Sequence, residues 1–346
     1  MVSSKKKKII GFIAVFLVVI AGGLSFGYYH FCKKSNFAPQ KTAYLYIYPN
    51  TAFNELVVQL KEKGGMIHEG TFTQLAQLKG ADKEIKAGCY AITDGMNNAD
   101  LLQMLTSGKQ TPIQLKYNNI RTMPQFAGRI SSQLMTDSVS LMKIFENEQF
   151  ISKLGFSHES LPAMFIPNTY QLYWTTSPEA FCERMKKEFD RFWNEKRSEK
   201  AKKIGLTPVE ISILASIVEE ETNKPDEFPI VAGLYINRLK TGMKLQADPT
   251  VKYAIGDFAL RRILYKHLEI DSPYNTYQNY GLPPGPIRFS SIQVIDAVLD
   301  YAHHDYIYMC AKEDLSGRHN FARTGAEHAR NREKYTSALN QRGIYR

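Results

Sequence analysis

The chain of 346 residues has few cysteines and histidines, the residues that form disulfide bonds in small secreted proteins or bind metals. Its four cysteines are far apart and form no C-x-x-C pair: they are Cys32, Cys89, Cys182 and Cys310. Neither a dense disulfide framework nor a cysteine-ligated zinc site is therefore expected. The eight histidines, including His303 and His304, lack ligand spacing to other donors, so no metal is expected.

The signatures of common soluble enzymes are also missing. The sequence has no P-loop, no dinucleotide-binding glycine pattern and no G-x-S-x-G nucleophile elbow. No internal repeat and no low-complexity segment stands out. These absences disfavour an enzyme of soluble metabolites.

Acidic residues are fewer than basic ones, 34 against 44, which gives a formal net charge of +10. Part of the excess is the lysine cluster 5–8, and the rest is scattered through helices such as 183–203, where both signs alternate around apolar residues. This pattern is typical of solvated amphipathic helices, so no nucleic-acid partner is expected. The remaining basicity suits an anionic surface, either phospholipid or acidic cell-wall polymer.

One long apolar run, residues 9–31, follows the lysine cluster. As a helix it is long enough to cross a bilayer of roughly 30 Å. By the positive-inside rule, residues 1–8 form a cytoplasmic tail, and the chain after this single-pass anchor lies on the outer, periplasmic side of the inner (cytoplasmic) membrane. A cleaved signal peptide is the alternative, with small residues at 21–23 as its cleavage site.

The remaining chain of about 310 residues is long enough for two or three domains. Residues 35–41 suggest a short tether, residues 42–150 a small α+β region with its linking segment, and residues 151–346 a separate C-terminal domain. The elements of the α+β region are expected in the order strand, helix, helix, strand, at 43–48, 52–61, 71–79 and 89–92. That order is found in LysM-type glycan-binding modules. Later elements are expected as a helix, a strand and a helix, at 98–107, 112–117 and 124–134.

Three consecutive carboxylates, Glu219–Glu221, end an otherwise apolar stretch, ILASIVEEET. Thr207, Pro208 and Glu210 have the spacing of an N-cap, a first-turn proline and a capping box. The spacing therefore predicts a helix from Thr207 to about Asn223.

Glu221 is the carboxylate of this helix that we expect to be desolvated. At about 100° per residue it shares one face with four apolar residues, whereas Glu219 and Glu220 lie away from that face. The four are Ile211, Leu214, Ile217 and Val218. Burial, neighbouring carboxylates and the helix dipole should raise the pKa of Glu221 towards that of a general acid. The alternative is a structural ion pair with Arg238 or Lys240.

Aromatic and amide side chains crowd the segment 272–287, SPYNTYQNYGLPPGPI. Flat apolar rings with hydrogen-bonding tips suit a sugar ring with its hydroxyls and acetamide. A rigid surface turn with exposed tyrosines is the alternative, because glycine and proline mark loops of every kind.

Several of these motifs occur in a fixed order: FIPNTYQLYW, SIVEEET, NRL, GMKLQADPTVKYA, SPYNTY, GLPPGPI and HNF. Together they closely resemble the YceG-like family of endolytic murein transglycosylases (MltG), over nearly the whole chain after residue 31. Two positions depart from the family pattern, Asn168 and Ala247, where the family often has an acidic residue and a threonine. The resemblance implies an N-terminal anchor, a LysM-like module and a mainly helical catalytic domain.

The resemblance also implies an activity. It is non-hydrolytic cleavage of peptidoglycan between N-acetylmuramic acid (MurNAc) and N-acetylglucosamine (GlcNAc), which leaves a 1,6-anhydro-MurNAc end. The catalytic glutamate of the family's V-E-x-E-T segment corresponds to Glu221, with Glu219 in reserve. No metal or organic cofactor is implied. Substrate-binding candidates are Tyr277, Asn275, Tyr274, Gln246, Asp248, His319 and Phe321.

The implied partners are nascent glycan strands, whose polymerisation the enzyme would terminate, and penicillin-binding synthases. Two other functions stay open. One is a lysozyme-like muramidase in which Glu221 or Glu219 pairs with Asp248 and admits water. The other is a membrane-tethered, non-catalytic peptidoglycan-binding scaffold.

Overall fold

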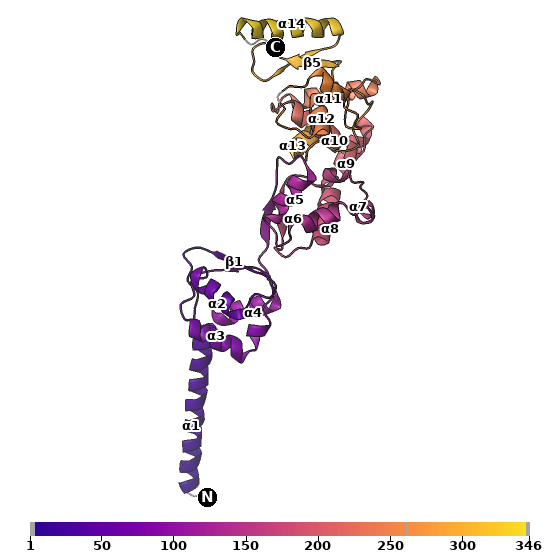
Figure 1. The fold of residues 1–346 in the computed structure, drawn as a ribbon. Coiled ribbons are helices and arrows are strands. Elements are labelled where there is room, and N and C mark those ends of the chain that lie inside the picture. The colour runs from indigo at the N-terminus through magenta and orange to yellow at the C-terminus, as the bar shows by residue number, and fades with distance from the viewer. Residues whose placement is uncertain (1–3, 261, 344–346) are drawn as a thin grey trace. The chain divides into compact units, whose positions relative to one another are not determined.

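The computed structural model describes residues 4–260 and 262–343. The predicted cytoplasmic tail 1–8 and C-terminal domain 151–346 therefore lie partly outside the described residues, at 1–3, 261 and 344–346. The chain forms two compact units (Figure 1). The first contains the residues up to 115 together with 171–176, and the second contains 116–170 and the residues from 177 onwards. The described residues form helices and three two-stranded sheets, so the α+β prediction is confirmed.

The first unit begins with the apolar helix α1, Ser4–Tyr28, which continues into one π-helical turn, η1, Tyr29–Lys33. Within the described residues this is the one helix with the length and hydropathy to cross a membrane, and none of its apolar window is buried. The helix is therefore compatible with a single-pass anchor.

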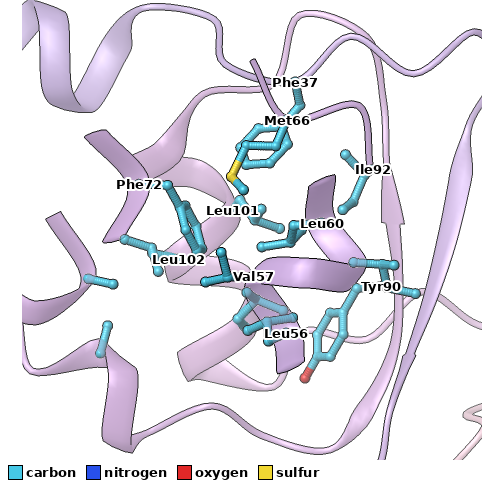
Figure 2. Packing of buried hydrophobic residues seen from close by; sticks show 14 of the residues in the cluster. Phe37, Leu56, Val57, Leu60, Met66, Phe72, Tyr90, Ile92, Leu101 and Leu102 are labelled. Carbon is cyan, nitrogen blue, oxygen red and sulfur yellow. The ribbon is translucent and has the colours of Figure 1, made fainter. Parts of the chain in front are cut away.

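A small α+β module follows. Its elements are β1 Ala43–Ile47, α2 Phe53–Glu62, α3 Glu69–Leu78, η2 Ala81–Lys83, β2 Gly88–Ile92 and α4 Asn98–Ser107. The two strands pair antiparallel, with Ala43 opposite Ile92. Their inner face and the helices enclose an apolar core, in which Figure 2 shows Phe37, Leu60 and Phe72. The expected strand-helix-helix-strand order is confirmed, and the likeness to LysM stays a prediction.

The segment 35–41 is packed against this module. Ser35 forms a bridge with Asn97, and Phe37 is fully buried in the core. The side chain of Asn36 donates a hydrogen bond of 2.7 Å to Asn98 Oδ1, and Asn98 Nδ2 donates to the carbonyl of Phe31. The apolar helix thus leads directly into the core of the module. The tether prediction rested on local composition, which does not show these contacts.

The second unit is mainly helical. Strand β3, Ile113–Lys116, pairs with β4, Thr169–Leu172, and the division between the units falls within both strands. The first helices of this unit, with one 3-10 turn, are α5 Met123–Ser131, α6 Ser138–Phe145, α7 Glu148–Lys153, η3 Leu161–Met164, α8 Pro178–Phe192 and α9 Glu195–Ile204. Residues 183–203 are thus divided between two helices, because Asn194 accepts a hydrogen bond from the Arg197 N–H and caps a new one.

The later elements of this unit carry most of the motifs noted in the sequence. They are α10 Pro208–Glu221, α11 Phe228–Lys240, α12 Asp248–Ile255, η4 Tyr265–Glu269, α13 Ile292–Leu299, β5 Tyr308–Ala311, β6 His319–Ala322 and α14 Gly325–Gln341. Helix α10 is central, since α9, α11, α12 and α13 all pack against it. This packing holds the C-terminal end of α10 in a fixed place.

Candidate active site

Helix α10 begins and ends as its sequence predicts. The Thr207 hydroxyl accepts from the Glu210 N–H, and the Glu210 carboxylate accepts from the Thr207 N–H, which completes a capping box. The predicted apolar face is also confirmed, because Ile211, Leu214, Ile217 and Val218 are fully buried. The helix ends at Glu221, since Thr222 has an extended backbone.

Glu221 lines a cavity of about 270 Å³. The walls come from α11, the start of α12, the loop before it, the 272–281 loop and the hairpin β5–β6. Five residues expected at the site meet here: Glu221, Gln246, Asp248, Tyr277 and His319. A second cavity of about 480 Å³ shares Asp248 and Tyr277 with the first. Together the two cavities offer room for more than one sugar ring.

The carboxylate of Glu221 accepts a 2.6 Å hydrogen bond from the Tyr235 hydroxyl. The pKa of Glu221 is raised from 4.5 to about 7; burial is the largest cause, and the negative charge of Asp248 acts in the same direction. The hydrogen bond from Tyr235 and the charges of Lys252 and Arg238 act in the opposite direction. Glu221 therefore carries a proton for a large part of the time near neutral pH.

The alternative of an ion pair is not what the described residues show. The guanidinium of Arg238 donates to the carbonyls of Ile307 and Leu245, at 2.7 and 2.8 Å. The ammonium of Lys240 donates to the hydroxyl of Tyr301. Arg238 thus lines the cavity as a structural cation whose donors bind main-chain oxygens and the side-chain oxygen of Gln246.

Tyr277 and Asp248 form a second tyrosine-carboxylate pair in the cavity. The Tyr277 hydroxyl donates a 2.6 Å hydrogen bond to Asp248 Oδ1. Burial, and then this hydrogen bond, raise the pKa of Tyr277, so the phenol stays protonated. Asp248 is the first residue of α12, where the helix dipole favours a carboxylate.

Asn275 and Tyr274 lie outside the cavity walls. The fully buried Asn275 side chain donates to the carbonyls of Leu268 and Ile270, and it accepts from the Tyr277 N–H. Its contacts hold the loop in the shape that presents Tyr277. The Tyr274 ring packs against Tyr253, with centroids 4.7 Å apart. The amide pattern thus reflects the architecture of the loop.

Gln246 and the two aromatic residues of the HNF motif differ in their placement. Gln246 has a positive φ of 49°, and its side chain accepts from Arg238. His319 lines the cavity. Phe321, two residues further along β6, stacks on the ring of Tyr306 instead.

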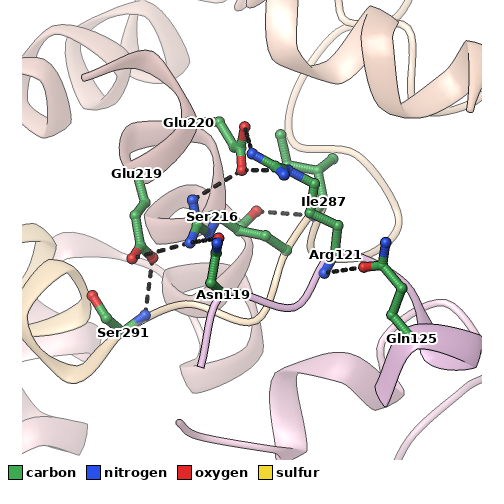
Figure 3. A network of polar contacts seen from close by, with 9 residues as sticks. Asn119, Arg121, Gln125, Ser216, Glu219, Glu220, Ile287 and Ser291 are labelled. Carbon is green, nitrogen blue, oxygen red and sulfur yellow. Dashed lines mark hydrogen bonds and ion pairs between the residues drawn. The ribbon is translucent and has the colours of Figure 1, made fainter. Parts of the chain in front are cut away.

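Glu219 and Glu220 belong to a separate polar network of ion pairs and hydrogen bonds, which Figure 3 shows. Arg288 makes ion pairs with both carboxylates, at 3.5 and 2.9 Å, and Arg121 makes one with Glu220 at 2.9 Å. Glu219 also accepts from the Ser291 N–H. The network explains why two further carboxylates can adjoin Glu221.

Sequence reasoning missed two residues of the site, Tyr235 and Glu227. Tyr235 is a lone tyrosine in the apolar stretch IVAGLYI of α11, three residues before Arg238. Such a polar tip in a buried helix needs a hydrogen-bond partner, which was the available signal. Glu227 precedes the same helix and gave no periodic signal.

Residues 45–334 match the model of the YceG-like family. The chain belongs to the YceG-like family. A relative from Bacillus subtilis named endolytic murein transglycosylase is 32% identical, over 82% of this chain and 82% of that protein. A Streptococcus pneumoniae protein of the same name is 28% identical, over 98% of this chain and 67% of its own length.

A solved structure supports the same fold. The 2.6 Å crystal structure of a YceG-like protein from Listeria monocytogenes has a TM-score of 0.56 and 26% sequence identity. The match covers 84% of this chain and 99% of that one. At this coverage the match extends over parts of both compact units described above.

Proposed function

We propose that this protein is an endolytic lytic transglycosylase of peptidoglycan, with Glu221 as its catalytic acid. The bond cleaved is the one between MurNAc and GlcNAc, and the product carries a 1,6-anhydro-MurNAc end. The observation that carries the proposal is a carboxyl group with a pKa of about 7 in the wall of a cavity of sugar-ring size. The names of the relatives support the substrate class.

The proposed first step uses Glu221 as a general acid. Its proton passes to the glycosidic oxygen while the bond from the anomeric carbon of MurNAc to that oxygen breaks. The GlcNAc side leaves as an alcohol. A carboxyl group that is still protonated near neutral pH suits this role, and Glu221 has that property.

The second step uses the same residue as a base. The carboxylate of Glu221 takes the proton from the C6 hydroxyl of MurNAc, and the C6 oxygen attacks the anomeric carbon and closes the anhydro ring. The hydrogen bond from Tyr235 stabilises the carboxylate between the two steps. Neither water nor a second carboxylate nucleophile is needed.

Tyr277 and Asp248 are proposed to position the substrate. Their mutual hydrogen bond fixes the phenol at the boundary of the two cavities. From there Tyr277 is placed to orient an acetamide or to stabilise charge at the anomeric carbon. Gln246 is proposed to contribute an amide from the same wall.

The apolar helix α1 is proposed as the single-pass anchor in the cytoplasmic membrane, with the rest of the first unit and the whole second unit on the outer side of that membrane. This location would bring the enzyme to newly made glycan strands. Termination of their growth, next to penicillin-binding synthases, is the proposed cellular role.

The test is digestion of purified glycan strands by the full-length protein in detergent, followed by mass spectrometry of the new ends. We expect anhydro-MurNAc ends from the wild type and none from Glu221→Gln. Glu219→Gln is the matched control, because Glu219 belongs to the separate polar network and forms an ion pair with Arg288. This variant should retain activity.

Other outcomes would contradict the proposal in different ways. Reducing MurNAc ends would identify a muramidase. Binding of strands without cleavage by the wild type would identify a scaffold. Loss of activity in Glu219→Gln, with Glu221→Gln active, would exchange the two roles.

A further inference from the structure

One buried carboxylate joins two parts of the cavity wall. Glu227 lies directly before α11 and has 3% of its surface exposed. Its Oε1 accepts a 2.8 Å hydrogen bond from the main-chain N–H of His319. Its Oε2 lies 3.0 Å from Nδ1 of the His319 ring, and it also accepts a 2.8 Å hydrogen bond from the Thr222 hydroxyl. Three donors therefore converge on one acid that the proposed reaction does not use.

The contacts of Glu227 favour its ionised form. Burial opposes ionisation, but the hydrogen bonds from the main chain and ring of His319 and from Thr222 outweigh it, so the pKa of Glu227 is lowered. A carboxylate can only accept hydrogen bonds, so the ring nitrogen that faces it must donate. The proton of a neutral His319 is thereby placed on Nδ1, and Nε2 keeps its lone pair.

The same acid couples this imidazole to the proposed catalytic helix. Thr222 is the C-cap of α10 and follows Glu221 directly. His319 begins β6, opposite Ala311 of β5, and both residues line the cavity with Glu221. Glu227 thus fixes the end of α10 and the edge of the hairpin at once, although 92 residues separate it from His319.

We propose that Glu227 is a positioning residue that holds His319 as the Nδ1–H tautomer, so that Nε2 accepts a hydrogen bond from a sugar hydroxyl in the cavity. Within the described part of the chain, no hydrogen bond from protein occupies Nε2, which is consistent with a ligand role. This inference rests on the proposed function, which supplies the glycan. The role is distinct from proton transfer by Glu221, and it adds specificity for a hydroxyl at one place in the cleft.

The first test is the tautomer itself, measured on the full-length protein in detergent by ¹⁵N NMR of labelled histidine. We expect the Nδ1–H form of His319 in the wild type at pH 7. In Glu227→Gln an amide can donate to Nδ1, so the Nε2–H form should gain population. A wild-type ring that carries its proton on Nε2, or on both nitrogens, would overturn the proposal.

The second test is steady-state cleavage of glycan strands. We expect Glu227→Gln and His319→Ala each to lower kcat/KM about tenfold, mainly through KM, the size expected for one lost hydrogen bond. The double variant should be no worse than His319→Ala, because Glu227 acts through the ring. Unchanged KM in His319→Ala, or additive losses in the double variant, would sink the idea.

A matched control is Asp226→Asn. Asp226 is the neighbouring carboxylate and also bonds to the hairpin, through Arg318, but it is exposed. It should leave both the tautomer and KM unchanged. If Glu227→Gln fails to fold, the wild-type spectrum and His319→Ala still decide the matter. If the wild type does not cleave, the proposed function fails separately, and strand affinity of His319→Ala replaces KM as the readout.

Discussion

The phenol of Tyr235 donates a 2.6 Å hydrogen bond to Oε1 of Glu221. The two residues lie 14 positions apart, on neighbouring helices α10 and α11; Tyr235 is buried, and Glu221 is partly buried in the cavity wall. Burial alone would hold Glu221 in its acid form, and the phenol lowers the free energy of the carboxylate. The balance of the two effects sets the pKa near 7, where one group can serve as acid and then as base.

Replacing Tyr235 by phenylalanine should move the alkaline limb of the pH profile to higher pH. The variant removes a hydrogen bond to the charged form of Glu221, so the pKa of Glu221 rises further. A hydrogen bond to a charged group is worth about 1.5 kcal/mol or more, which corresponds to roughly one pH unit. The measurement is kcat/KM for strand cleavage between pH 5 and 9. An unchanged limb would show that Tyr235 does not tune the acid.

Replacing Asp248 by asparagine should move the same limb in the opposite direction. The negative charge of Asp248 raises the pKa of Glu221, and the amide removes that charge but can still accept from Tyr277. Anhydro ends should still form. In a muramidase that uses Asp248 as nucleophile, this variant would instead lose activity by orders of magnitude.

Glu221→Gln should stabilise the folded protein at alkaline pH. The folded-state pKa of about 7 lies above the ordinary value of 4.5. Stability is therefore unaffected by this group below pH 4.5, falls as pH rises from 4.5 to about 7, where the unfolded chain loses this proton and the folded state keeps it, and is level above that pH. At about 1.4 kcal/mol per pKa unit, a rise from 4.5 to about 7 corresponds to a cost of roughly 3–4 kcal/mol at pH 8. Urea denaturation should show that gain for the variant at pH 8 and little difference at pH 4.5.

Arg288→Met should destabilise the second unit by about 2–4 kcal/mol. It leaves Glu219 without its ion pair and Glu220 with one arginine, and both side chains are mostly buried at 15% and 17% exposure. Arg121→Met is the matched control. Arg121 is 34% exposed and Glu220 keeps Arg288, so a loss of about 1 kcal/mol or less is expected. Equal losses in urea denaturation would contradict this ranking.

The sequence was informative where local signals and burial agree. The capping pattern at Thr207 predicted the start of α10, and helical periodicity placed Glu221, unlike Glu219, on its apolar side. The motif order also identified the family, which the match over 45–334 confirms. Local chemistry and tertiary packing point to the same answer at these positions.

Contacts between distant segments could not be read from the chain. The distant partner of Glu227, His319, lies on β6, and those of Glu219 and Glu220 come from residues 121 and 288–291. Asn275 was expected to touch substrate because amides suit sugars, yet it fills a buried turn. Whether a polar side chain serves a ligand or its own loop depends on which backbone groups the fold leaves unpaired.

The packing of residues 35–41 against the module limits how far the proposed membrane-anchored enzyme can move from the membrane. As a flexible linker, these residues could span roughly 24 Å when fully extended. Phe37 is buried in the core, and Asn98 Nδ2 donates a hydrogen bond to the carbonyl of Phe31. Residues 35–41 therefore do not act as an extended linker between the anchor and the module. The module would therefore stay at a fixed distance from the bilayer surface, and it would rotate together with the anchor helix.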